Sequence, residues 1–268
     1  MDVTPSDWTF YLSALIYLWQ AVWLTYGVTL TCRRSVSGYL YRAYPVMPPI
    51  LYVVFSFSLA CNISWLLIWD REYMEVALVF INLMACTLFI CLVVSLRRLN
   101  DYGHLMIHDK VHRDIWLIRI FVQNGLAMYA TWATVASIFN FALVLTFRTG
   151  AEQEVGSMVS LTVFTLEIFA WWIFDNFVFE KLFRYLITPY VVVLVAIVGI
   201  ISNNWDPTAN NSIYTVTLLA LSVFLTVIKC VLAAYKHWKH PIFGAKPSYR
   251  RPLVSFEVRS LLESQQHS

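Results

Sequence analysis

The chain has 268 residues, of which 59% are hydrophobic and only 13% are charged, and its mean hydropathy is +0.64. A soluble domain keeps roughly a quarter of its residues charged, so this composition excludes an ordinary soluble protein and predicts a polytopic membrane protein. The formal net charge of +3 is modest. We therefore expect the lipid bilayer, and no nucleic acid, as the partner of the chain.

Seven segments are apolar and long enough to cross a bilayer, which takes about 20 residues at 1.5 Å each. They cover residues 8–30, 49–69, 74–96, 116–146, 157–179, 185–203 and 213–235. We predict an all-α bundle of seven transmembrane helices, in the plasma membrane or an endomembrane. The chain then divides into a unit of four helices (1–147), three additional helices (148–239) and a flexible tail (240–268).

The charges of the loops predict the orientation. The basic loops follow the first, third, fifth and seventh segments, and their Lys and Arg residues are Arg33, Arg34, Arg42, Arg97, Arg98, Lys110, Arg113, Lys181, Arg184, Lys236, Lys239, Lys246, Arg250 and Arg251. The positive-inside rule places these loops in the cytoplasm, with the N-terminus outside and the C-terminus inside. The sequon that begins at Asn210 falls in an outer loop and is a candidate for glycosylation.

Four polar side chains lie from mid-membrane toward the outer half of the predicted helices, where such groups are costly and often functional. They are Asn62, Asn82, Asn140 and Glu167. They could line one pocket, or the amides could tie neighbouring helices together. An unpaired carboxylate in the bilayer is unfavourable, so we expect Glu167 to be neutral or to face water.

Two further charges, Asp175 and Lys229, lie toward the cytoplasmic ends of the fifth and seventh segments. A salt bridge between them is the simplest way to accommodate both in the membrane.

The sequence contains no pattern typical of a catalytic or metal site. His104, His108 and His112 are spaced four residues apart, but Lys110 and Arg113 lie among them, and we interpret the segment as a solvated turn without a metal. The chain lacks a Ser/His/Asp set, a phosphate loop and paired histidines at membrane depth. We predict neither an enzyme nor a bound cofactor.

Three segments carry a resemblance to a known family. The spacing of Tyr129, Trp132, Ala136 and Asn140 resembles Tyr-x-x-Trp-x-x-x-Ala-x-x-x-Asn in the last helix of the TspO/MBR (tryptophan-rich sensory protein/translocator protein) family. The segments Leu59-Ala60-Cys61-Asn62-Ile63-Ser64-Trp65 and Leu18-Trp19-Gln20-Ala21-Val22-Trp23 resemble two other family segments, in the family's order. The resemblance covers the first four predicted helices.

The resemblance implies a pocket for a small, flat hydrophobic ligand such as a porphyrin or a sterol, between the first, second and fourth helices. The ligand-binding residues that it implies are Trp19, Trp23, Asn62, Trp65, Tyr129, Trp132 and Asn140. Indole faces can stack on a flat apolar ligand, and amides can orient its polar edge.

We therefore predict a membrane protein that binds such a ligand. Whether it also transports or senses the ligand, and whether it forms a homo-oligomer, is left open. One alternative is an ion- or proton-coupled transporter or channel that uses Glu167, Asp175 and Lys229. Another is a heptahelical receptor, although Asp-Arg-Tyr in the third helix and Asn-Pro-x-x-Tyr in the seventh are missing.

Overall fold

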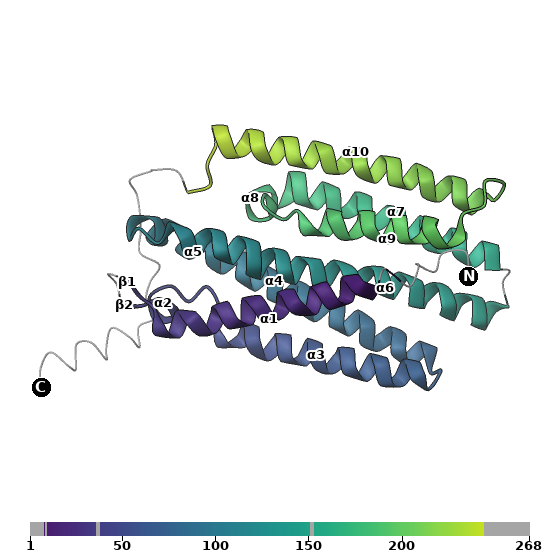
Figure 1. The fold of residues 1–268 in the computed structure, drawn as a ribbon, viewed down its shortest axis with the longest axis horizontal. Coiled ribbons are helices and arrows are strands. Elements are labelled where there is room, and N and C mark those ends of the chain that lie inside the picture. The colour runs from purple at the N-terminus through teal and green to yellow at the C-terminus, as the bar shows by residue number, and fades with distance from the viewer. Residues whose placement is uncertain (1–7, 9, 36–37, 151–152, 244–268) are drawn as a thin grey trace, which may run out of the picture.

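The computed structural model describes residues 8, 10–35, 38–150 and 153–243, and these residues form an elongated bundle of helices (Figure 1). Residues 244–268 of the predicted tail lie outside the described residues. The elements in chain order are α1 (Phe10–Cys32), β1 (Arg34–Ser35), β2 (Gly38–Tyr39), α2 (Leu40–Ala43), α3 (Pro49–Asp70), α4 (Met74–His108), α5 (His112–Leu117), η2 (Ile118–Gln123), α6 (Asn124–Thr149), α7 (Gln153–Ile173), η3 (Phe174–Val178), α8 (Glu180–Phe183), α9 (Thr188–Asn204) and α10 (Asn210–Lys239).

The long helices occur where the sequence predicts them. Within the described residues, six are long and apolar enough to cross a membrane, and the seventh apolar helix, α9, has 17 residues. At 1.5 Å per residue α9 is about 26 Å long, which is near the lower limit for a spanning helix. The chain is therefore an integral, multi-pass membrane protein.

The two wide helical segments, η2 and η3, have π-helical geometry and continue directly into or out of a long helix. The segment η2 joins α5 to α6, and η3 extends α7. Single π-helical turns of this kind are rare and often mark functional positions. Each of the two holds a buried charged residue, Arg119 in η2 and Asp175 in η3.

The basic loops gather at one end of the bundle, as predicted. The β1–β2 hairpin, α2, α5, α8 and the last turn of α10 all lie toward the same end in Figure 1. Arg33, just after α1, pairs with Asp114 of α5 at 2.5 Å, and Arg184 donates to the carbonyl of His240 at 2.6 Å. We refer to this end as the basic end; its position in the cytoplasm stays a prediction.

The interior consists of two apolar clusters that share α6. The larger cluster packs α1, α3, α4 and α6 together, and the smaller one packs α6 against α7, α9 and α10. Small side chains such as Ala127, Ala130 and Ala133 of α6 are fully buried and allow close helix packing. The outer surface carries exposed apolar side chains, which is the pattern of a lipid-facing bundle. The division into units at residue 147 stays a prediction.

Candidate functional site

The two tryptophans of α1 that the resemblance implies in ligand binding are bonded within the bundle. The Trp23 indole is fully buried, donates to Oε1 of Gln20 at 2.6 Å and meets the ring of Phe55 edge to face at 4.9 Å. The Trp19 indole donates to the carbonyl of Phe121 at 3.1 Å. Both indoles join α1 to the neighbouring helices.

The amides of α3 and α6 also bond to protein groups. Asn62 donates to the Tyr17 hydroxyl at 2.7 Å, and the Trp65 indole donates to Oδ1 of Asn140 at 3.4 Å. The Asn140 amide nitrogen donates to the carbonyl of Ala136 at 2.9 Å. The structure thus brings Trp65 of α3 and Asn140 of α6 together.

The last two implied residues lie on α6. The Trp132 indole donates to the Ser13 hydroxyl at 3.0 Å, and the buried Tyr129 hydroxyl contacts the sulfur of Met84 at 3.6 Å. All seven residues implied by the resemblance therefore sit in interfaces between helices. None of them lines the cavity described next.

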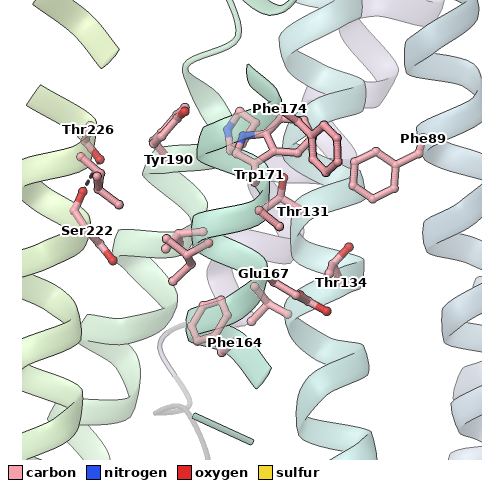
Figure 2. A pocket seen from close by; sticks show the side chains of 16 residues that line it. Phe89, Thr131, Thr134, Phe164, Glu167, Trp171, Phe174, Tyr190, Ser222 and Thr226 are labelled. Carbon is pink, nitrogen blue, oxygen red and sulfur yellow. Dashed lines mark hydrogen bonds between the residues drawn. The ribbon is translucent and has the colours of Figure 1, made fainter. Parts of the chain in front are cut away.

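A cavity of about 270 Å³ lies on the other side of α6, between α6, α7, α9 and α10 (Figure 2). Phe89 of α4 reaches its edge. The lining is mostly apolar and rich in aromatic rings, and its members are Phe89, Thr131, Thr134, Val135, Phe164, Glu167, Ile168, Ala170, Trp171, Phe174, Pro189, Tyr190, Val193, Ser222, Leu225 and Thr226.

Two polar atoms in the cavity wall have no hydrogen-bond partner among the described residues. They are the indole nitrogen of Trp171 and the hydroxyl oxygen of Ser222. Buried polar atoms are almost always hydrogen-bonded, so an unpaired donor and an unpaired hydroxyl at one cavity indicate room for a ligand or for water. The Trp171 ring itself is held by stacking on Phe183 at 5.3 Å.

The other predicted polar residues, Glu167 and Asn82, have different surroundings. Glu167 lines the cavity from α7, near Thr134 in Figure 2, and no hydrogen bond or ion pair holds it within the described part of the chain. Asn82 is exposed, and within the described residues it donates only to the carbonyl of Leu78 in its own helix, at 2.7 Å. Asn82 therefore ties no helices together.

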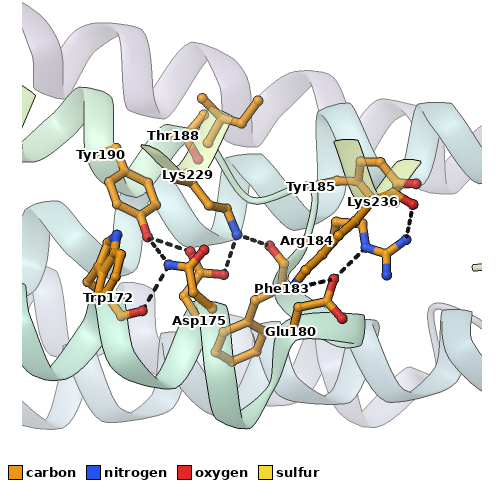
Figure 3. A network of polar contacts seen from close by, with 12 residues as sticks. Trp172, Asp175, Glu180, Phe183, Arg184, Tyr185, Thr188, Tyr190, Lys229 and Lys236 are labelled. Atoms are coloured by element: carbon orange, nitrogen blue, oxygen red, sulfur yellow. Dashed lines mark hydrogen bonds and ion pairs between the residues drawn. The ribbon is translucent and has the colours of Figure 1, made fainter. Parts of the chain in front are cut away.

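The predicted salt bridge between Asp175 and Lys229 is confirmed (Figure 3). The ammonium of Lys229 lies 2.5 Å from Oδ1 of Asp175, and both side chains are buried. The Tyr190 hydroxyl donates to Oδ2 of Asp175 at 2.5 Å, and Lys229 also donates to the carbonyl of Phe183 at 3.3 Å. Because Tyr190 lines the cavity, this ion pair lies directly behind the cavity wall.

A second group of charges continues from this pair to the basic end. Glu180 accepts a hydrogen bond from Arg184 at 2.7 Å and pairs with Lys236 at 3.6 Å. Burial raises the pKa of the Glu180 carboxyl, but the neighbouring Arg184 and Lys236 outweigh it and hold this pKa below its usual value.

The sequence did not indicate the role of Asn124, the first residue of α6. Its Oδ1 accepts hydrogen bonds from the backbone of Ile187 and Thr188 at 3.0 and 3.2 Å, and its amide donates to the carbonyls of Tyr185 and Arg119 at 2.9 and 2.8 Å. Asn124 thus fixes the start of α9, and hence one wall of the cavity, to α6. No pattern in the sequence indicates this role, because Asn124 falls inside the helix predicted over residues 116–146.

Asn210 is the first residue of α10, is exposed and lies at the end opposite the basic end. Its glycosylation stays a prediction.

His104 and His108 belong to α4 and His112 begins α5. In the described part of the chain, no three His, Cys, Asp or Glu side chains gather closely enough to hold a metal ion.

Comparison with known proteins gives one family. A family model described as TSPO-like protein matches residues 2–231 of the chain. The match continues through α7, α9 and most of α10, whereas the three resembling segments lie in α1, α3 and α6. The comparisons with curated proteins and with solved structures give no match.

Proposed function

Because the chain belongs to the TSPO-like protein family, we propose that it binds a small, flat hydrophobic ligand of the porphyrin or sterol type in the cavity between α6, α7, α9 and α10. The observation that carries this proposal is the pair of unbonded polar atoms, on Trp171 and Ser222, in an otherwise aromatic and apolar wall. Aromatic faces would stack on the ligand, and the few polar groups would orient it.

The size of the cavity limits how the ligand sits. Sites for drug-sized ligands measure about 300–1,000 Å³, so a cavity of about 270 Å³ is at the small end. A sterol or porphyrin would enter with one edge and leave the rest beside Phe174, whose side chain is 48% exposed. Entry from the bilayer along α7 and η3 would suit such a ligand, because the lining residues Glu167, Ala170 and Phe174 of these two segments are exposed.

The test is a titration of the detergent-solubilised protein with protoporphyrin IX, haem and cholesterol, followed by quenching of tryptophan fluorescence. We expect saturable quenching in the micromolar range by at least one of them. Trp171→Phe removes the indole nitrogen in the cavity. It should raise the dissociation constant of this ligand about tenfold, because an anchoring polar contact is lost. Trp205→Phe, an exposed tryptophan remote from the cavity, controls for the loss of a fluorophore.

The same titration separates the two sets of residues. If Trp132→Phe and Asn140→Ala weaken binding while Trp171→Phe does not, the ligand lies among the residues implied by the resemblance, and the cavity proposal is wrong. If no ligand gives a saturable response, the ligand class is wrong.

A second candidate function is ion- or proton-coupled transport, favoured by the position of the Asp175–Lys229 pair behind the cavity wall. Tyr190 contacts both the cavity and Asp175, so occupancy of the cavity could be linked to this pair. Currents across proteoliposomes that depend on a proton gradient and vanish in Glu167→Gln would favour the transporter. Binding without such currents would favour the pure binder.

A further inference from the structure

Arg119, in the π-helical segment η2, is buried without an acidic partner. Its exposed fraction is 6%, and no carboxylate lies within ion-pair distance of it in the part of the chain that the structure describes. Its guanidinium instead lies over three aromatic rings, 4.0 Å from the centre of Tyr185, 5.0 Å from Trp116 and 5.2 Å from Phe243. We call this arrangement the Arg119 cage.

The other buried charges at the same end of the bundle do have acidic or basic partners. Arg184 pairs with Glu180 at 2.7 Å, and the buried carboxylate of Asp114 is held by Arg33 at 2.5 Å. Removing an ion from water is expensive unless an opposite charge compensates it. Contacts with aromatic faces offset only part of that cost, so Arg119 retains unused capacity for an anion.

Two hollows adjoin the guanidinium. One measures about 140 Å³ and is also lined by His112, Trp116 and His237. A smaller one of about 20 Å³ is also lined by Gln123 and Lys181. No aspartate or glutamate lines either hollow, so the groups around Arg119 add positive charge or hydrogen-bond donors and no negative charge.

The hollows are open to the outside and lie at a defined depth. Trp116 is 42% exposed, and His112, Lys181 and His237 are exposed as well. Trp116 of the cage belongs to α5, which lies at the basic end of the bundle in Figure 1, and Arg119 precedes the long apolar stretch of α6. In a bilayer this is the level of the headgroups, where basic pockets between helices bind phosphate-bearing lipids.

We infer that the Arg119 cage binds an anion that carries a phosphate group. A guanidinium presents paired donors that match phosphate oxygens, and Lys181 and the two histidines would supply further donors around it. The phosphate could belong to an anionic phospholipid or to a soluble phosphate. The inference is independent of the proposed ligand in the cavity, because no residue lines both the cavity and either of the two hollows.

The test uses the full-length protein in a neutral detergent and measures the midpoint of thermal unfolding. The additions are dioctanoyl phosphatidic acid, dioctanoyl phosphatidylcholine and inorganic phosphate. We expect saturable stabilisation by phosphatidic acid and not by phosphatidylcholine. Stabilisation by inorganic phosphate at a similar concentration would identify a soluble phosphate as sufficient, and its absence would identify the lipid.

Arg119→Gln removes the charge and should raise the apparent dissociation constant about tenfold or more, because a charge-assisted contact is lost. The matched control, Arg113→Gln, changes an exposed arginine of α5 that lines neither hollow, and it should bind as the wild type does. Equal stabilisation of Arg119→Gln and wild type, or no saturable response to either phosphate compound, would overturn the inference.

If Arg119→Gln does not fold, two other variants test the same site. Lys181→Gln and Trp116→Ala change exposed residues at the rims of the two hollows. Each substitution should lower the affinity for phosphatidic acid severalfold, and wild-type affinity in both variants would reject the site.

Discussion

At the residue scale, the buried charges of this protein differ in how they are satisfied. Asp175 and Lys229 compensate each other, and Tyr190 supplies the remaining hydrogen bond to the carboxylate. Removing one partner of a buried ion pair typically lowers the stability by about 3–5 kcal/mol, whereas replacing both partners with neutral groups lowers it much less. Neither Asp175 nor Lys229 can therefore be replaced alone without a large loss of stability, although the pair itself adds little net stability.

This difference gives a prediction. Lys229→Met should lower the free energy of unfolding by roughly 3 kcal/mol, because it leaves Asp175 buried and unpaired. Adding Asp175→Asn to Lys229→Met should restore most of that loss. Unfolding in mixed micelles measures both, and additive losses in the double variant would contradict the account.

At the element scale, the long helices could be predicted and their junctions could not. Apolar length alone located each spanning helix within a few residues, although α4 extends to His108, well past the predicted end at residue 96. The π-helical segments η2 and η3 have no simple sequence signal, so the positions of Arg119 and of the cavity could not be derived. A cavity depends on which helix faces meet, and α6 was expected to face its pocket with Tyr129, Trp132 and Asn140, which lie on its other side.

The junction between α6 and α9 gives the second prediction. Asn124→Ala removes hydrogen bonds to the backbone of Ile187 and Thr188 and should cost about 2–3 kcal/mol. Amide hydrogen exchange at residues 187 and 188 should accelerate before that of α6. Asn82→Ala, at an exposed amide bonded only within its own helix, is the control and should change stability by less than about 0.5 kcal/mol.

At the scale of the whole molecule, the loop charges predicted one shared end for the basic loops, and the structure places them there. The implied pocket residues were predicted from family spacing. Their aromatic members, Trp19, Trp23, Trp65, Tyr129 and Trp132, all pack in or against the larger apolar cluster. Such motifs record helix packing as well as ligand contact, which is why spacing could not distinguish the two. The orientation in the membrane has its own test.

Single cysteines would report that orientation in a variant whose five native cysteines are replaced by serine. Pro207→Cys, at the turn before α10, should react with a membrane-impermeant maleimide added to intact cells. Lys239→Cys, at the basic end, should react only after the membrane is permeabilised. The reverse pattern would show that the basic end lies outside, contrary to the positive-inside rule.

The most direct test of the central claim, that the cavity is a ligand site, is to fill it. Ser222→Leu replaces an unbonded buried hydroxyl with a side chain that occupies the space. It should raise the free energy of unfolding by about 1 kcal/mol, because the cavity and the unsatisfied oxygen are both removed. It should also raise the dissociation constant of the ligand that quenches tryptophan fluorescence tenfold or more. Increased stability with undiminished ligand affinity would contradict the account.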